Sequence, residues 1–233
     1  MVHDSRTKYR LKFTKSGTVR FIGHLDLMSL FNMSIKRAGL PIAYSEGFNP
    51  HQLLSFALPL SLGYYSDGEY LDVVFKHSLS CDEIVRRLNG NLADGVTIIS
   101  MRELESGEKS AAAQVVACDY KINLPSHSGI SAQSAANFIA QDKIIIMKKT
   151  KKSVSDADIS ADILKFEALS DSGEVTELNV LLSAGAERSL RADLVLKALY
   201  AFAGIAYPEF GAKFTRLEMY HEKGGKILPL MAT

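Results

Sequence analysis

The stretch from residue 21 to residue 59 constrains the fold most, because a helix, an irregular loop and an apolar run follow one another within it. Apolar side chains recur at helical spacing over residues 24–38, which predicts an amphipathic helix. Gly39 and Pro41 then form a strong helix stop. Residues 53–58 are apolar nearly throughout and predict a buried central strand. The loop over residues 45–51 therefore connects a helix to a core strand.

Strand and helix patterns continue on both sides of this stretch. Alternating apolar and polar residues predict strands over residues 9–13, 70–75 and 96–101, and Ser80 predicts the start of a helix over residues 81–88. The resulting order, β-α-β-β-α-β, is that of a ferredoxin-like domain. After a small, polar segment the same order recurs, with one additional short strand at residues 143–147 and a charged tract over residues 148–162. In this half we predict a hairpin about residues 171–173 and a last helix that is capped by Ser189 and extends to residue 202.

We therefore predict an α+β protein made of two tandem ferredoxin-like (βαββαβ) subdomains with antiparallel sheets. The first subdomain covers residues 1–103, the linker residues 104–113 and the second subdomain residues 114–223. Residues 224–233 are expected to form a frayed tail. The repeat is one of element order, because the two halves show no similarity residue by residue.

Composition narrows the class of protein. The 233 residues carry a formal net charge of +1, whereas a protein that binds nucleic acid with its whole surface is usually strongly basic. Two distant cysteines, Cys81 and Cys118, exclude a disulfide framework, a thiolate zinc site and a cysteine-ligated cluster within this chain. The polar N-terminus and the short apolar runs predict a cytoplasmic protein without a signal peptide or membrane span.

Polar side chains at the start of the first helix are the first site candidates. The dipole of that helix disfavours a charged imidazole, so His24 is expected to be neutral and able to act as a base or ligand. The simpler interpretation is a histidine bonded to a nearby carbonyl. Asp26 suits the capping of the first helical turn better than catalysis.

The loop over residues 45–51 is the second candidate. Gly47 permits a positive φ and Pro50 restricts the backbone, so the loop can hold side chains in fixed positions. We expect Phe48 to be largely buried and to anchor the loop; an exposed Phe48 ring would instead serve binding. The polar side chains that such a loop would present for binding are Glu46, Asn49 and His51. His24, Glu46 and His51 are also potential metal ligands, but nothing in the sequence fixes their distances and no metal site is predicted.

A lysine tract in the second half is the third candidate. It comprises Lys148, Lys149, Lys151 and Lys152, and Asp156, Asp158 and Asp162 follow it. Such a run is usually a solvated loop, yet it also suits contact with RNA phosphates. The aspartates decide between the two, because they neutralise the lysines if they fold back. Arg188 and Arg191, at the start of the last predicted helix, would extend the same basic patch.

Three segments carry a resemblance to a known family: RFIGHLDLM, KRAGLPIAYSEGFNPH and SFALPL. They resemble the radical-SAM-linked family of unknown function, whose domain is fused behind a radical SAM domain or encoded beside one. The resemblance is specific over residues 9–75 and weaker beyond. The family usually has Ser in place of Gly23 and Pro in place of Gln52. In fold order and in a histidine near the first helix, the chain more distantly resembles tandem ferredoxin-like proteins that process CRISPR repeat RNA.

The family resemblance implies a non-catalytic binding module that works with a separately encoded radical SAM enzyme and presents RNA or a ribosomal component to it. The partner would carry S-adenosylmethionine and an iron–sulfur cluster; this chain has no CxxxCxxC triplet and is expected to bind no cofactor. The alternative is a small RNA-processing or RNA-modifying enzyme with His24 and His51 as acid and base. That alternative requires both imidazole rings to face one cleft.

Overall fold

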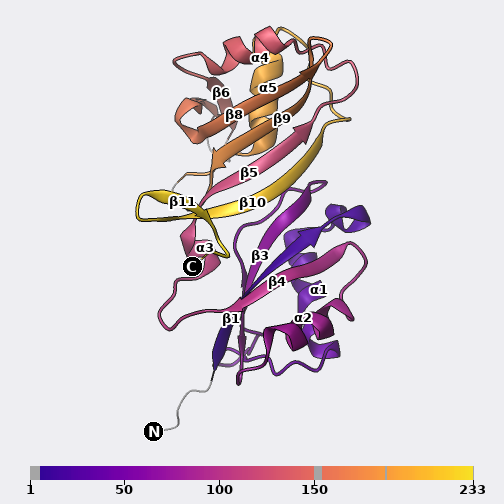
Figure 1. Ribbon diagram of the computed structural model, residues 1–233, viewed down its shortest axis with the longest axis vertical. Coiled ribbons are helices and arrows are strands. Elements are labelled where there is room, and N and C mark those ends of the chain that lie inside the picture. Colours follow the sequence, from indigo (N-terminus) through magenta and orange to yellow (C-terminus); the bar gives the residue numbers. More distant parts are fainter. Residues whose placement is uncertain (1–5, 150–153, 187, 233) are drawn as a thin grey trace. The chain divides into compact units, whose positions relative to one another are not determined.

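Figure 1 shows the computed structural model, which describes residues 6–149, 154–186 and 188–232. The chain divides into two compact units. The first contains Met1–Val115 and Glu218–Thr233, and the second contains Val116–Leu217. The predicted linker over residues 104–113 thus lies in the first unit, close to its division from the second, and the end of the chain returns to the first unit.

The first unit contains the predicted β-α-β-β-α-β order. Its elements are β1 (Thr7–Lys15), a short 3-10 helix (Gly17–Phe21), α1 (His24–Arg37), β2 (Leu54–Phe56), β3 (Tyr65–Phe75), α2 (Cys81–Asn89), β4 (Val96–Glu103), α3 (Ala111–Gln114) and β11 (Lys226–Pro229). The sheet has the order β4-β1-β3-β2, and its neighbouring strands are antiparallel. β10 (Lys213–Lys223) begins in the second unit and ends in the first.

The helix boundaries follow from the capping residues. Gly23 precedes α1, and its backbone amide donates to Asp26 Oδ2 at 3.3 Å, as the sequence predicted. Gly39 ends the helix with a φ of +61°, a conformation that favours glycine. Ser80 accepts from the amide of Glu83 at the start of α2. These three positions confirm the predicted limits of both helices to within a residue.

Both helices pack on one face of the sheet (Figure 1). The buried side chains from the helices are Leu27, Phe31 and Ile35 of α1 and Ile84 and Leu88 of α2. Those from the sheet are Tyr9, Leu11, Phe13, Leu71, Val73, Phe75, Val96 and Ile98. The alternation in β1 and β3 therefore identified the face that carries the core.

The apolar run over residues 53–58 is a shorter and more peripheral strand than predicted. β2 pairs with β3 over three residues, and Ser55 in its middle is exposed. Phe56 fills the core from this strand, with its ring 5.5 Å from that of Phe31. The residues on either side of Ser55 pack against the core of the first unit, and this packing explains why the run is apolar. The strand itself is not central.

The second unit contains one strand more than predicted. Its elements are β5 (Val115–Asn123), α4 (Ala132–Ile139), β6 (Ile145–Lys149), β7 (Val154–Asp158), a short 3-10 helix (Ser160–Asp162), β8 (Ile163–Asp171), β9 (Glu174–Ser183) and α5 (Ala192–Phe202). β5, β9 and β8 are antiparallel neighbours, and β6 pairs with β7 in a separate sheet. Part of the charged tract is therefore strand.

Two local predictions for this unit had different outcomes. The hairpin about Asp171 is confirmed, since Ser172 and Gly173 both have positive φ between β8 and β9. The predicted helix start at Ser189 is wrong, because α5 begins at Ala192. The amide of Leu190 donates to the carbonyl of Ser183, so this part of the chain is tied to the end of β9 before the helix begins.

The protein is thus a mixed α/β chain with few helices and mostly antiparallel sheets. The tandem ferredoxin-like description stays a prediction, since the β6–β7 hairpin adds to the expected order. No helix in the described part of the chain is long and apolar enough to cross a membrane.

The expected frayed tail over residues 224–233 is wrong. β11 pairs with β10 in antiparallel register, from Lys223 opposite Lys226 to Tyr220 opposite Pro229. Leu230 is fully buried, and its carbonyl accepts from Arg10 in β1. The hairpin turn at Gly224 and Gly225 was a local signal that the sequence analysis did not use. The contact with Arg10 had no local signal, because Arg10 lies 220 positions away in the sequence.

A packed tail predicts a measurable loss of stability on truncation of its buried side chain. Leu230→Ala should lower the free energy of unfolding by about 2–5 kcal/mol, as for other buried leucines. The control Ile227→Ala, at a position of β11 that is 42% exposed, should cost less than about 1 kcal/mol. Urea unfolding of both variants measures the difference. Equal, small losses would mean that the tail is not packed in solution.

Candidate binding pocket and loop

A pocket of about 240 Å³ opens on the first unit beside the 45–51 loop. Side chains alternate across a strand, so Leu53, Ser55 and Val74 lie on the face opposite the helices, while Phe56 and Val73 pack on them. The pocket therefore opens on the face that α1 and α2 leave uncovered. The residues that line it include Leu53, Val74 and Leu104 as apolar groups and Lys8, His51, Ser55 and Ser110 as polar groups.

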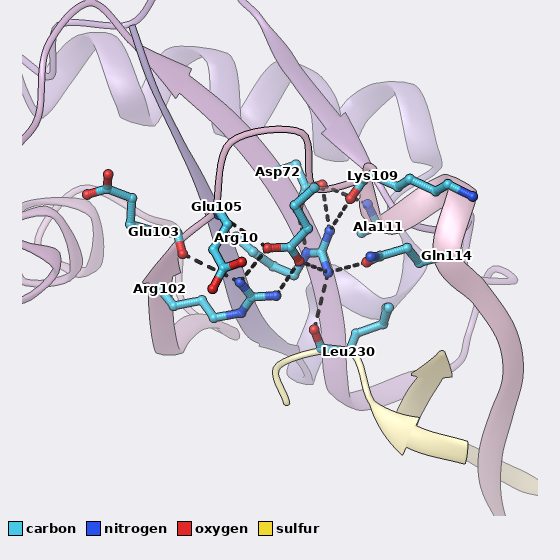
Figure 2. Close-up of polar contacts among 10 residues, drawn as sticks. Arg10, Asp72, Arg102, Glu103, Glu105, Lys109, Ala111, Gln114 and Leu230 are labelled. Carbon is cyan, nitrogen blue, oxygen red and sulfur yellow. Dashed lines mark hydrogen bonds and ion pairs between the residues drawn. The ribbon is translucent and has the colours of Figure 1, made fainter. Parts of the chain in front are cut away.

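Asp72 also lines the pocket and is held by a buried arginine (Figure 2). Arg10 is fully buried and binds both carboxylate oxygens of Asp72, from Nε to Oδ1 at 2.8 Å and from Nη2 to Oδ2 at 3.1 Å. Its other three N–H groups donate to Gln114 Oε1, the carbonyl of Lys109 and the carbonyl of Leu230. All five donors of the guanidinium are thus satisfied.

Glu108 also lines the pocket and extends this network. Arg102 donates to both of its oxygens, at 2.9 and 2.6 Å, and Arg10 Nη1 lies 3.5 Å from Oε1. The hydrogen bonds from Arg102 hold the pKa of the Glu108 carboxyl below its usual range. The amide of Ala111 donates to Asp72 Oδ2 at 2.7 Å. Both carboxylates are therefore structural groups that fix the 104–114 segment against the sheet.

The 45–51 loop is closed by hydrogen bonds between its two ends. The amide of Ser45 donates to the carbonyl of His51 at 2.8 Å, and the amide of His51 donates to Ser45 Oγ at 3.1 Å. His51 Nδ1 lies 2.9 Å from the same hydroxyl. Gly47 has a φ of +112°, which confirms the need for glycine there. His51 thus connects the loop to the pocket that it lines.

Phe48 is fully exposed, so its predicted burial is wrong. The hydrogen bonds between Ser45 and His51 close the loop below it and leave its ring at the tip. The core position that an aromatic anchor would fill belongs to Phe56, whose ring packs against Phe13 at 6.0 Å. Burial was inferred from residue type, and residue type alone does not tell which of two nearby phenylalanines enters the core.

The remaining polar residues of the loop are also exposed. Glu46 pairs with Arg6 at 3.3 Å, but its side chain is 90% exposed, and such a surface pair adds little stability. Asn49 lies at the exposed tip beside Phe48. Both residues are therefore placed where a partner can reach them.

The two histidines that the alternative hypothesis uses as acid and base have different surroundings. His24 is the first residue of α1, is half-buried, and has its ring 5.3 Å from the ring of Phe56. His51 is exposed and lines the pocket, and His24 is absent from the lining of that pocket. Among the described residues, no group of three or more His, Cys, Asp or Glu side chains is arranged to hold a metal ion.

The lysine tract lies partly outside the described residues. The backbone of Lys148 and Lys149 belongs to β6, in register with Ser155 and Val154 of β7, while Lys151 and Lys152 fall in the segment that the structure does not describe. Asp158 Oδ1 accepts from the amides of Ile144 and Ser160. The bonds from Ser160 lower the pKa of this carboxyl. Asp158 therefore stabilises the backbone at the base of the hairpin.

The two arginines that were expected to extend the basic patch are each paired with a carboxylate. Arg188 Nε lies 2.7 Å from Asp162 Oδ1. Arg191 binds Asp193 through Nε at 2.9 Å and Nη2 at 2.8 Å, although its side chain is mostly exposed. Both keep exposed surface, but part of their charge is compensated within the second unit.

Sequence reasoning missed the Arg10 network. The alternation of β1 places Arg10 on the face opposite the core, where a polar residue suggests solvent. One signal was available: Arg10 lies directly opposite Asp72 in the antiparallel register of β1 and β3. Opposite charges at such a position stabilise a strand pair. No feature of the sequence near Arg10 or Asp72 indicates that the last residues of the chain bury this pair.

The comparison with known proteins identifies the family of this chain. It belongs to the family described as an uncharacterized protein conserved in bacteria (DUF2344), whose profile matches residues 8–192. A solved structure, that of an unknown protein from Galdieria sulphuraria, aligns over 91% of this chain and 97% of its own, with 14% identity and a TM-score of 0.27. That score is too low to support a common fold. No curated protein matches.

The pKa of Glu108 predicts how stability changes with pH. A carboxyl whose pKa is lowered by folding adds stability above its unfolded pKa and loses that contribution as pH falls through the folded value. Glu108→Gln should therefore lower the free energy of unfolding at pH 7 by about 1–3 kcal/mol. The deficit relative to wild type should shrink as pH falls below about 4. Urea unfolding at several pH values measures this, with the exposed Glu46→Gln as control. A deficit that is constant with pH would contradict the assignment.

Proposed function

We propose that this chain is a non-catalytic binding module that works with a separately encoded radical SAM enzyme and presents RNA to it, on a scaffold of two tandem ferredoxin-like subdomains. The sequence segments around α1 support the link to radical SAM proteins by their resemblance to the radical-SAM-linked family. The exposure of Phe48 carries the proposal of a binding surface.

An exposed phenylalanine on a closed loop suits binding better than folding. Hydrogen bonds between Ser45 and His51 already close the loop, so Phe48 is not needed as an anchor. Burying such a ring against a partner is worth about 1.5–3 kcal/mol. Aromatic side chains on a preformed surface are also the groups on which unpaired RNA bases stack.

The pocket beside the loop adds groups that fit a nucleotide. Its apolar floor accepts a base or a ribose face, and Lys8 and His51 on its rim offer donors to phosphate oxygens. Asp72 and Glu108 are compensated by their arginines and so repel an anionic ligand little. The lysine tract, in the second unit, is a separate candidate for contact with RNA phosphates.

The alternative, an RNA-processing enzyme, gains no support from the geometry. Acid–base catalysis by His24 and His51 needs both rings within reach of one reacting group. His24 packs against Phe56 and does not line the pocket that His51 lines. A partner-dependent binding role needs only His51 and the loop.

The test compares two exposed phenylalanines. Phe48→Ala should leave the free energy of unfolding within about 0.5 kcal/mol of wild type, since the ring packs on nothing, and should weaken binding of single-stranded RNA at least about tenfold. Phe210→Ala, an equally exposed ring in the second unit, should bind as wild type does. Filter binding at fixed salt measures affinity, and co-purification from native cells asks whether RNA and a cluster-bearing protein accompany the chain. Unchanged RNA affinity of Phe48→Ala would reject the loop as the binding surface.

A further inference from the structure

Strand β8 is the edge strand of the sheet in the second unit (Figure 1). It pairs with β9 in antiparallel register, and within the described ranges no other strand pairs with it. None of its nine residues is buried, whereas β9 is buried at Val175, Leu178, Val180 and Leu182. An edge strand directs about half of its N–H and C=O groups away from the sheet. β8 therefore presents backbone groups to which a further strand can bind.

Two opposite charges lie in the middle of this edge. Lys165 and Glu167 are separated by one residue and so lie on the same face of β8. Their side chains are 67% and 50% exposed, and Lys165 Nζ lies 3.5 Å from Glu167 Oε2. An ion pair that is this exposed adds little stability to the fold. Both charges are therefore available to a partner.

The residue between the two charges lies on the other face of the strand. The ring of Phe166 packs against that of Phe138 in α4, with 5.8 Å between the ring centres. This contact holds the middle of β8 in place from the helix side. Leu164 and Leu169, on either side of the charged pair, are 46% and 44% exposed. The edge thus has a charged centre and apolar ends.

The order of these charges decides whether an identical strand can pair with β8. A lysine usually protects an edge strand, because a second copy brings like charges together. Two antiparallel copies of a strand are related by a two-fold axis through the centre of their pairing. With the axis at Phe166, Lys165 of each copy lies opposite Glu167 of the other. With the axis at Lys165 or at Glu167, like charges meet and oppose the pairing.

The same register matches the apolar ends of the strand. Leu164 lies opposite Ala168 of the second copy, and Leu169 lies opposite its Ile163. Cross-strand apolar pairs of this kind stabilise a sheet. Because one pair of strands buries less surface than a permanent dimer interface, the association should be weak, with a Kd of about 10–100 µM.

We propose that β8 is a homodimer interface, in which it pairs with β8 of a second copy in antiparallel register about Phe166. The sheet of the second unit then continues from one copy into the other through backbone hydrogen bonds. The two pairs between Lys165 and Glu167 select this register. The proposal does not depend on RNA binding, since it uses no residue of the 45–51 loop or of the pocket beside it.

Sedimentation velocity on the full chain, at concentrations from about 5 to about 500 µM, measures the association. The proposal predicts an equilibrium between monomer and dimer in this range. Because ion pairs at an exposed edge are screened, the dimer should weaken as the salt concentration rises. A chain that stays monomeric over the whole range would overturn the proposal and leave the edge of β8 to a strand of another protein.

Charge reversals test the register. Lys165→Glu and Glu167→Lys each bring like charges together and should each weaken the association at least about tenfold. An equimolar mixture of the two variants should form a heterodimer at least as tight as the wild-type dimer, because a negative strand then meets a positive one. Glu209→Lys, at an exposed position outside β8, controls for the change in net charge and should associate as wild type does. Single variants that associate like wild type, or a mixture that stays monomeric, would contradict the proposed pairing.

Discussion

The pairing of Arg10 with Asp72 is the interaction on which the first unit depends. A guanidinium that is fully removed from water must find a partner for each of its donors, because an uncompensated buried charge is strongly destabilising. Asp72 supplies two acceptors from the neighbouring strand. The other acceptors come from Lys109, Gln114 and Leu230, which belong to the segment after β4 and to the end of the chain. One buried cation thus fixes two segments that have little regular structure of their own.

Two pockets of the first unit border this network. Asp72 and Glu108 line the pocket beside the 45–51 loop, and Glu108 and Gln114 line the pocket that contains His221. The network residues are engaged with one another, so they provide rigid walls rather than reactive groups. The groups left for ligands lie at the edge of the network, where Phe48 and His51 are exposed. The proposed binding role uses these exposed groups and leaves the network itself intact.

Much of the local structure could be predicted from the sequence, because its causes are local. Asp26 caps α1, Gly39 ends it, and Ser172 with Gly173 forms the turn between β8 and β9. The failures concern contacts between distant residues. Nothing near Leu230 in the sequence shows that its carbonyl accepts from the buried Arg10, and nothing near Phe48 shows that Phe56 already fills the core. The loop remains a candidate site, with its aromatic residue exposed instead of buried.

A double-mutant cycle on Arg10 and Asp72 tests the central claim most directly. The free energy of unfolding is measured by urea titration for Arg10→Met, Asp72→Leu and the double variant. If the pair fixes the unit, each single variant should lose about 3–5 kcal/mol, and the double variant should lose less than the sum by at least about 2 kcal/mol. Losses that add to within about 0.5 kcal/mol would show that the two side chains act independently and would contradict the account.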